Sequence, residues 1–345
     1  MTEKTFLGTA LALIQAPMAG AQDARLALAV SEAGALGSLP AAMLAPEALE
    51  RELQTLQAAG RPYNVNFFAH TPPTPDAARL ERWQAALRPY YDELGLDPAQ
   101  APAGASRRPF SAQEAEAMER FCPAVVSFHF GLPTPELLAR VKRLGALVLS
   151  TATTVEEALW LQAQGADAVI AQGLEAGGHR GHFLSTDISG QTDTLTLVAR
   201  CAKALDIPVI AAGGISDAAD VRAALERGAS AVQVGTAFLL SAEATTGALH
   251  RARLRDQAAP TELTNLFSGG LARGFINRAM RELGPVSAVA PPFPLASSAL
   301  APLRAQAEAQ GRDDFTPLWS GTNRSGCREV PAAEIVQALA AGLSN

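Results

Sequence analysis

The chain has 345 residues, of which 48% are hydrophobic and 18% are charged, and its formal net charge is −6. This composition is typical of a globular protein with a large buried core and excludes an intrinsically disordered chain. Acidic and basic residues are interspersed and the apolar stretches are short, so neither a nucleic-acid-binding stripe nor a membrane-spanning segment is predicted.

Short apolar runs alternate with helix-period segments along most of the chain. Eight runs are predicted to be strands, at 11–18, 35–39, 63–69, 124–130, 146–151, 168–172, 208–212 and 231–236. Amphipathic helices are predicted between them, at 23–32, 46–58, 134–143, 154–164, 192–205 and 217–227. This alternation predicts parallel strands with right-handed crossovers, and eight units predict a closed α/β fold, the (β/α)8 or TIM barrel.

Two stretches depart from the repeat. Residues 71–112 hold many prolines and glycines around an aromatic helix at 77–91, and they are predicted to be an insertion after the third strand. The tail beyond residue 255 is rich in helix formers. We therefore expect a barrel over residues 1–255 and a helical C-terminal subdomain over 256–345 that covers one end of the barrel.

Two strand ends carry a pattern suited to phosphate. Gly213-Gly214 follow the seventh predicted strand and Gly235-Thr236 follow the eighth. Barrel enzymes commonly hold phosphate at these two positions, because glycine lets backbone N–H groups approach the anion. The alternative is that these glycines only make tight turns. The sequence contains neither a dinucleotide GxGxxG motif after a strand nor a P-loop.

Polar side chains are expected at other strand ends. Asn66 and Gln172 carry donors and acceptors that suit the edge of a flat heterocycle such as an isoalloxazine, or they are satisfied polar groups within the protein. His129 is a candidate general acid or base, with a structural histidine as the alternative. Strand alternation predicts that His129 faces away from its neighbour Phe130.

A glycine-rich loop, QGLEAGGHRGH, occupies residues 172–182. His179 and His182 show HxxH spacing, but no nearby carboxylate cluster completes a ligand set, so no metal is predicted. Arg180 is either a solvated loop residue or a group that attracts an anion. No GxSxG motif is present, so acyl transfer is not supported.

Eight ordered segments resemble one family: QAPMAG, NVNFF, VVSFHFGLP, QGLEAGGHRG, PVIAAGGISD, VQVGTAFLLSAEA, FSGGLARGFIN and PLWSG. They are similar to the class I nitronate monooxygenases, formerly called 2-nitropropane dioxygenases, which are FMN-dependent TIM-barrel enzymes. The resemblance runs from about Leu13 to Ser320. The chain departs from the family pattern at Gly270-Leu271, where Arg-Pro is frequent, and at Thr322, where glutamine is common.

The resemblance implies oxidation of an alkyl nitronate, such as propionate 3-nitronate, by O2 to a carbonyl compound plus nitrite and nitrate, without NAD(P)H. It implies that Met18 approaches the flavin, that Asn66 and Gln172 hydrogen-bond it, that His129 is catalytic and that His179 lines the substrate pocket. The residues implied to hold the FMN ring, ribityl chain and phosphate are Gly177, Gly178, Gly213, Gly214, Gln233, Gly235 and Thr236.

Two other functions stay open. A related barrel could reduce its substrate with NAD(P)H, as an FMN-dependent enoyl-ACP reductase or quinone reductase, and the histidine of SFHFG favours the nitronate enzyme over these. A non-catalytic FMN-binding protein is the second alternative, against which His129 argues. The expected partners are a small nitronate and O2, with no nucleic acid or membrane. Three widely separated cysteines favour the cytoplasm, and a monomer or weak homodimer is expected.

Overall fold

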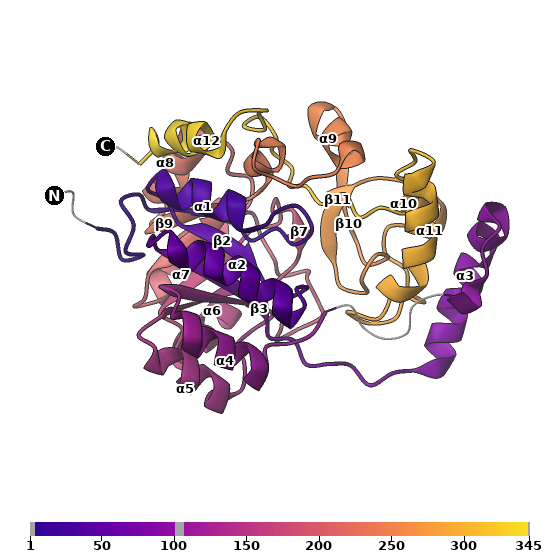
Figure 1. Ribbon diagram of the computed structural model, residues 1–345, viewed down its shortest axis with the longest axis horizontal. Helices are drawn as coiled ribbons and strands as arrows, with labels where there is room; N and C mark the ends of the chain where they lie inside the picture. The colour runs from indigo at the N-terminus through magenta and orange to yellow at the C-terminus, as the bar shows by residue number, and fades with distance from the viewer. Residues whose placement is uncertain (1–3, 101–106, 344–345) are drawn as a thin grey trace.

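The computed structural model describes residues 4–100 and 107–343. Eight parallel strands form one sheet in the order β1-β9-β8-β6-β5-β4-β3-β2. A bridge between Ile14 and Leu36 joins the first and last strands of this order, so the sheet closes on itself. Helices surround it (Figure 1), which confirms the predicted (β/α)8 barrel.

Each predicted barrel strand has a counterpart in the structure. The strands are β1 (Leu13–Gln15), β2 (Gly37–Pro40), β3 (Tyr63–Phe68), β4 (Val125–His129), β5 (Leu147–Ala152), β6 (Ala168–Gln172), β8 (Val209–Ala212) and β9 (Ala231–Val234). The helices of the ring are α1 (Ala24–Glu32), α2 (Pro46–Ala58), α4 (Ala112–Phe121), α5 (Pro135–Arg143), α6 (Val155–Ala163), α7 (Thr194–Ala204) and α8 (Ala218–Glu226). Of these helices, α4 was not predicted.

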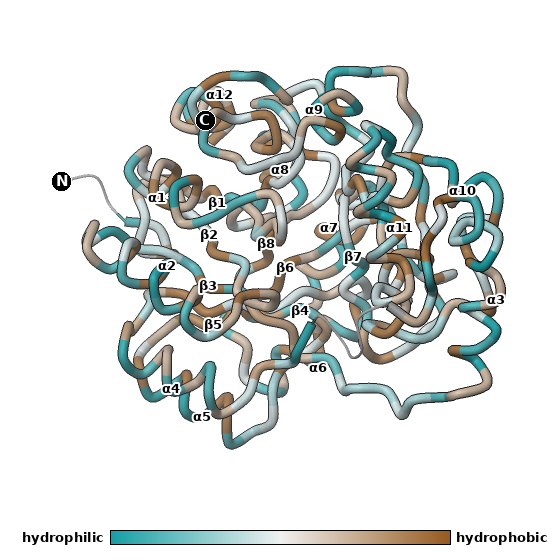
Figure 2. The backbone as a smooth tube through the Cα atoms, turned by 45° about the vertical axis from the view of Figure 1, so that its right-hand side comes forward, coloured by the Kyte–Doolittle hydropathy of each residue, from teal (hydrophilic) through white to brown (hydrophobic). Residues whose placement is uncertain are grey.

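Strand alternation divides the core into two layers. On β6, Ile170 belongs to the cluster that includes Ile14, Leu149 and Ile210, whereas Val169 packs with side chains of the surrounding helices. In Figure 2, apolar colour is concentrated on the central strands, and polar colour is more frequent on the outer helices. Burial on both faces explains why these strands are continuous apolar runs in the sequence.

The insertion after β3 contains α3 (Ala77–Leu94) and the short helix η1 (Pro98–Gln100), and residues 101–106 of the predicted insertion lie outside the described residues. Helix α3 lies beside α11 (Ser297–Ala309), away from the barrel (Figure 1). Two buried side chains of α3 connect the helices, since Trp83 Nε1 donates to Ala296 O (3.2 Å) and the Tyr91 hydroxyl donates to Ala299 O (2.6 Å). The insertion therefore belongs to the same packed unit as part of the tail.

The tail is not wholly helical, which corrects the expectation from its composition. Besides α10 (Arg278–Leu283), α11 and α12 (Ala332–Ala340), it contributes β10 (Thr261–Thr264) and β11 (Ala272–Phe275), while η2 (Thr236–Leu240) and α9 (Ala248–Arg255) precede it. The two strands form an antiparallel sheet with β7 (Gly178–His179), which lies inside the glycine-rich loop. Helix α12 returns to pack on α1 and α8 (Figure 1). The domain boundary near residue 255 therefore stays a prediction.

Candidate active site

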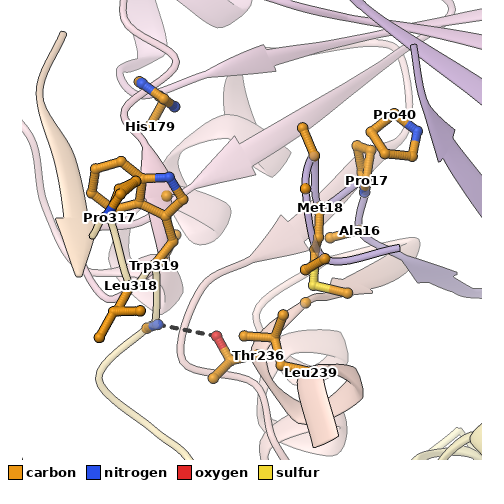
Figure 3. A pocket seen from close by; sticks show the side chains of 18 of the residues that line it. Ala16, Pro17, Met18, Pro40, His179, Thr236, Leu239, Pro317, Leu318 and Trp319 are labelled. Atoms are coloured by element: carbon orange, nitrogen blue, oxygen red, sulfur yellow. Dashed lines mark hydrogen bonds between the residues drawn. The ribbon is translucent and has the colours of Figure 1, made fainter. Parts of the chain in front are cut away.

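A cavity of about 630 Å³ lies at the carboxyl ends of the barrel strands, between these ends and the tail. Its volume is in the range of cofactor and ligand pockets. In Figure 3, Pro17, Met18 and Pro40 form one wall, and His179 and Trp319 lie on the opposite side. All twelve residues predicted for the site line this cavity: Met18, Asn66, His129, Gln172, Gly177, Gly178, His179, Gly213, Gly214, Gln233, Gly235 and Thr236.

The two glycine-containing strand ends present unpaired backbone donors. Within the described part of the chain, the N–H groups of Gly213, Gly214, Gly235 and Thr236 have no protein acceptor. Gly214 has φ +69°, a conformation that glycine adopts without strain. All four residues line the cavity, and free backbone N–H groups at such a place are suited to bind an anion such as a phosphate group.

The three strand-end amides differ in how far the protein already satisfies them. Asn66 Nδ2 donates to the Ser127 hydroxyl (3.0 Å). Gln172 binds its own loop, because Nε2 donates to His179 O and Oε1 accepts from Gly181 N–H, each at 2.9 Å. Gln233 Oε1 is buried and has no hydrogen-bond partner among the described residues. Gln233 therefore has the clearest unused acceptor in the cavity wall, one that a ligand N–H could satisfy.

His129 is held at both ring nitrogens. Nε2 lies 3.2 Å from the carbonyl oxygen of His179, and Nδ1 lies 3.0 Å from the Thr151 hydroxyl. Since a carbonyl can only accept, Nε2 carries the proton of the neutral ring and Nδ1 accepts from Thr151. The pKa of His129 is lowered to about 4, mainly by burial and in smaller part by the charge of Arg180, while the hydrogen bond to the His179 backbone opposes the shift, so the ring is neutral at pH 7.

His179 has one ring nitrogen in use and one without a recorded partner. Its Nε2 lies 2.7 Å from the hydroxyl of Ser268, a buried tail residue that the sequence analysis did not single out. Nδ1 makes no hydrogen bond within the described residues. Burial holds the pKa of His179 well below its usual value. The ring is therefore neutral, and Nδ1 can accept a hydrogen bond when Nε2 carries the proton.

The predicted alternation around His129 is wrong at Phe130. Strand β4 ends at His129, and Phe130 has φ +69°, so its side chain no longer follows the strand period. The Phe130 ring lies 4.6 Å from the His129 ring and 4.9 Å from the ring of Phe293 in the tail. Left-handed backbone costs a non-glycine residue about 1–3 kcal/mol, and this aromatic cluster offsets the cost.

Both interpretations of Arg180 are also wrong. Its side chain is fully buried and donates to the carbonyls of Gln172 (2.9 Å) and Gly173, and to Gln191 Oε1 (3.0 Å). Burial lowers its pKa to about 10. Arg180 therefore holds the loop from within. His182 is half-buried and lies outside the cavity lining, and no cluster of potential metal ligands occurs among the described residues.

The tail closes the cavity above the two glycine-containing strand ends, Gly213-Gly214 and Gly235-Thr236, which are called the phosphate-type loops below. Gly321 N–H donates to the Thr236 hydroxyl (3.0 Å), as Figure 3 shows, and His250 Nε2 lies 2.9 Å from Trp319 O. A Cβ on Gly177 would lie 2.5 Å from Gly321 N. Position 177 must therefore be glycine, because the tail backbone at Ser320 and Gly321 leaves no room for a side chain there. Sequence reasoning missed the tail residues of the site, although the motif PLWSG contains Pro317, Leu318, Trp319 and Gly321 of the cavity wall.

The fold and the cavity define a (β/α)8-barrel protein with its ligand site at the carboxyl ends of the strands. None of its described helices is long and apolar enough to cross a membrane. The chain belongs to the nitronate monooxygenase family, because the family model described as "Nitronate monooxygenase" matches residues 2–342. Homologues of this name are oxidoreductases, and the family is generally flavin-dependent.

Individual relatives support this assignment. The chain is 42% identical to the nitronate monooxygenase of Pseudomonas aeruginosa over 344 residues, which cover 96% of each protein. It is similar to the crystal structure of nitroalkane oxidase from Streptomyces ansochromogenes, with a TM-score of 0.86 and 39% identity over 97% of this chain and 96% of that one. FabK from Thermotoga maritima shares the fold, with a TM-score of 0.70 and 24% identity over 96% and 92% of the two chains.

Proposed function

We propose that this protein is an FMN-dependent nitronate monooxygenase that oxidises alkyl nitronates, such as propionate 3-nitronate, with O2 to a carbonyl compound plus nitrite and nitrate. The observation that carries the proposal is a single cavity lined by residues whose backbone N–H groups have no acceptor among the described residues and by two histidines that are neutral at pH 7. No NAD(P)H takes part in the proposed reaction.

The residues of the cavity fit FMN. The N–H groups of Gly213, Gly214, Gly235 and Thr236 would hold the phosphate, since N–H donors with no protein acceptor suit an anion. The unused Gln233 Oε1 would accept from the flavin ring or ribityl chain. When bound, the flavin would supply an acceptor for electrons from the anionic substrate. Met18, Asn66, Gln172, Gly177 and Gly178 complete the proposed cofactor wall.

The two histidines would have different tasks at this site. His129 Nε2 is bonded to the His179 carbonyl, so His129 fixes the backbone that carries the second ring. His179 Nδ1 has no hydrogen-bond partner among the described residues, and this nitrogen would accept a proton when a neutral nitroalkane enters. We retain His129 as a catalytic candidate, because its ring lines the cavity and could exchange its bond to Thr151 for one to substrate. Both rings would orient an incoming nitronate.

An FMN-dependent NAD(P)H reductase is the second candidate, because the strand ends Gly213-Gly214 and Gly235-Thr236 would suit the phosphate of FMN in either enzyme. One experiment separates the two. The purified protein, checked first for released FMN, is mixed without oxygen either with propionate 3-nitronate or with NADH or NADPH, and the flavin absorbance is followed. We expect the flavin absorbance to change with propionate 3-nitronate and to stay unchanged with NADH or NADPH. Full bleaching by a pyridine nucleotide, with no response to the nitronate, would support the reductase instead, and a response to neither would support a non-catalytic flavoprotein.

A further inference from the structure

The tail segment 320–327 is hydrogen-bonded directly to the two phosphate-type loops. Gly321 N–H donates to the Thr236 hydroxyl (3.0 Å), and Gly326 N–H donates to the Ser216 hydroxyl (2.7 Å), just beyond Gly214. Between these two anchors, the side chain of Asn323 lines the cavity. Asn323 lies immediately after Thr322, where the sequence departs from the family pattern.

Asn323 is fixed in one orientation by its contacts. Both hydrogens of Nδ2 are used, since the group donates to Gly214 O and to Asp220 Oδ2, each at 3.0 Å. Oδ1 accepts from the backbone N–H of Ser325 (3.1 Å) and from its hydroxyl (2.9 Å). This pattern also settles which end of the amide carries the nitrogen.

The bond to Gly214 O controls the direction of a backbone donor. A trans peptide is planar and its C=O and N–H point in opposite directions. Because Asn323 holds the carbonyl of the Gly214–Ile215 peptide, the N–H of Ile215 points away from Asn323. Ile215 lines the cavity, and its N–H has no acceptor among the described residues. Gly214 imposes little preference of its own on this peptide, since glycine populates both signs of φ.

We propose that Asn323 is a positioning residue for the phosphate of FMN: it turns the Gly214–Ile215 peptide so that the N–H faces the anion. The inference rests on the proposed function. A second contact serves the same end, because Nδ2 stands between the Gly214 carbonyl and the Asp220 carboxylate. Asn323 thereby screens a negative charge from the loop that receives a phosphate dianion. Asp220 is further occupied by the Ser216 N–H (2.9 Å).

The test compares FMN with riboflavin, which carries the same ring and ribityl chain without the phosphate. Full-length wild type, Asn323→Ala, Asn323→Asp and the control Thr322→Ala are freed of flavin and titrated with each ligand by fluorescence. Thr322 is exposed and contributes its backbone N–H to Glu175 O, so its side chain is dispensable here.

We expect Asn323→Ala to weaken FMN binding about tenfold, equivalent to about 1.4 kcal/mol, with riboflavin affinity unchanged. Asn323→Asp keeps the shape of the side chain but places a carboxylate beside Asp220, so it should weaken FMN further and in a salt-dependent way. Thr322→Ala should match wild type for both ligands. Urea unfolding of the flavin-free variants checks that the tail remains folded.

Equal losses for FMN and riboflavin would overturn the proposal, because they would show a general effect on the tail rather than on the phosphate. Unchanged FMN affinity in both Asn323 variants would overturn it as well. The proposed function fails separately, if wild type binds neither flavin.

Discussion

Replacing Arg180 by methionine would test whether the glycine-rich loop is held from inside by a buried cation. Arg180 donates to two carbonyls, those of Gln172 and Gly173, and to the side-chain oxygen of Gln191. Gln191 in turn donates to the Thr153 hydroxyl (2.9 Å), which donates to the buried carboxylate of Glu157 (2.7 Å). Methionine keeps most of the apolar volume and removes every donor.

Two effects of this change oppose each other. A hydrogen bond from a charged donor contributes about 1.5–3 kcal/mol, and three acceptors would lose theirs. Against this, burying a cation without a direct carboxylate contact costs several kcal/mol, which the variant would recover. Because two of the three acceptors are backbone carbonyls that cannot turn toward water without moving the loop, we expect the losses to exceed the gain. The expected net decrease in the free energy of unfolding is about 3 kcal/mol.

Urea unfolding followed by tryptophan fluorescence measures this decrease. The ring centroids of Trp160 and Phe183 lie 5.1 Å apart, and Phe183 follows the loop, so one of the three tryptophans that contribute to the emission lies beside the loop. Arg88→Met is the matched control, because Arg88 and Asp92 form an exposed pair that contributes at most about 1 kcal/mol. A loss below about 1 kcal/mol at Arg180, or a gain, would refute the reasoning and show that desolvation of the cation dominates.

Three further predictions concern the site. His129→Asn should retain FMN and lose at least roughly tenfold in turnover, and His179→Asn should lose at least as much. Steady-state kinetics with propionate 3-nitronate measures both variants. An unchanged turnover rate in His179→Asn would contradict the proton-accepting role of His179. Burial lowers the pKa of His129 and of His250 to about 4 in the folded protein, whereas an unfolded histidine takes up its proton near pH 6.5. The free energy of unfolding should therefore fall as pH drops from about 6.5 to about 4, by up to about 3 kcal/mol per histidine. Urea midpoints that do not change between pH 7 and pH 5 would contradict this. Gly177→Ala would place a Cβ 2.5 Å from the Gly321 nitrogen and so displace the tail. This should lower the free energy of unfolding by about 1–3 kcal/mol and reduce the amount of FMN bound after purification. A normal FMN content would show that the tail can move aside.

The barrel could be predicted because its signals are local. Each strand is buried on both faces and each helix on one, so apolar runs and helical periodicity both appear in the sequence. Strands β10 and β11 gave no such signal. The segment Thr261–Thr264 is short and mostly partly exposed, and its sheet is completed by two residues, Gly178 and His179, more than 80 positions earlier. Strand β10 itself pairs with β11, and only β11 pairs with that distant segment. Strands of four residues that are partly exposed are too short to show a clear periodic pattern.

The site shows the same division. Strand-end residues such as Asn66 and Gly235 could be placed because a parallel barrel gathers all its carboxyl ends at one rim. The burial of Arg180 could not be placed, since its acceptors are mostly backbone carbonyls, which leave no pattern of side chains in the sequence. Phe130 was misplaced because the left-handed turn begins at this phenylalanine, one residue before Gly131, which is the residue that marks the turn in the sequence.

The glycines of the glycine-rich loop serve two different physical purposes, tight packing within the protein and space for a ligand. The motif alone therefore could not show which glycines lie beside a ligand. A Cβ on Gly181 would lie 2.6 Å from Thr151 Cγ2 and 2.8 Å from His129 Cε1, so this glycine is required by the packing of the protein itself. Gly178 is the opposite case, since a Cβ there would meet no atom within 4 Å although φ is +72° and the residue lines the cavity. Packing therefore accounts for Gly181, and space left beside Gly178 is space that a ligand can use.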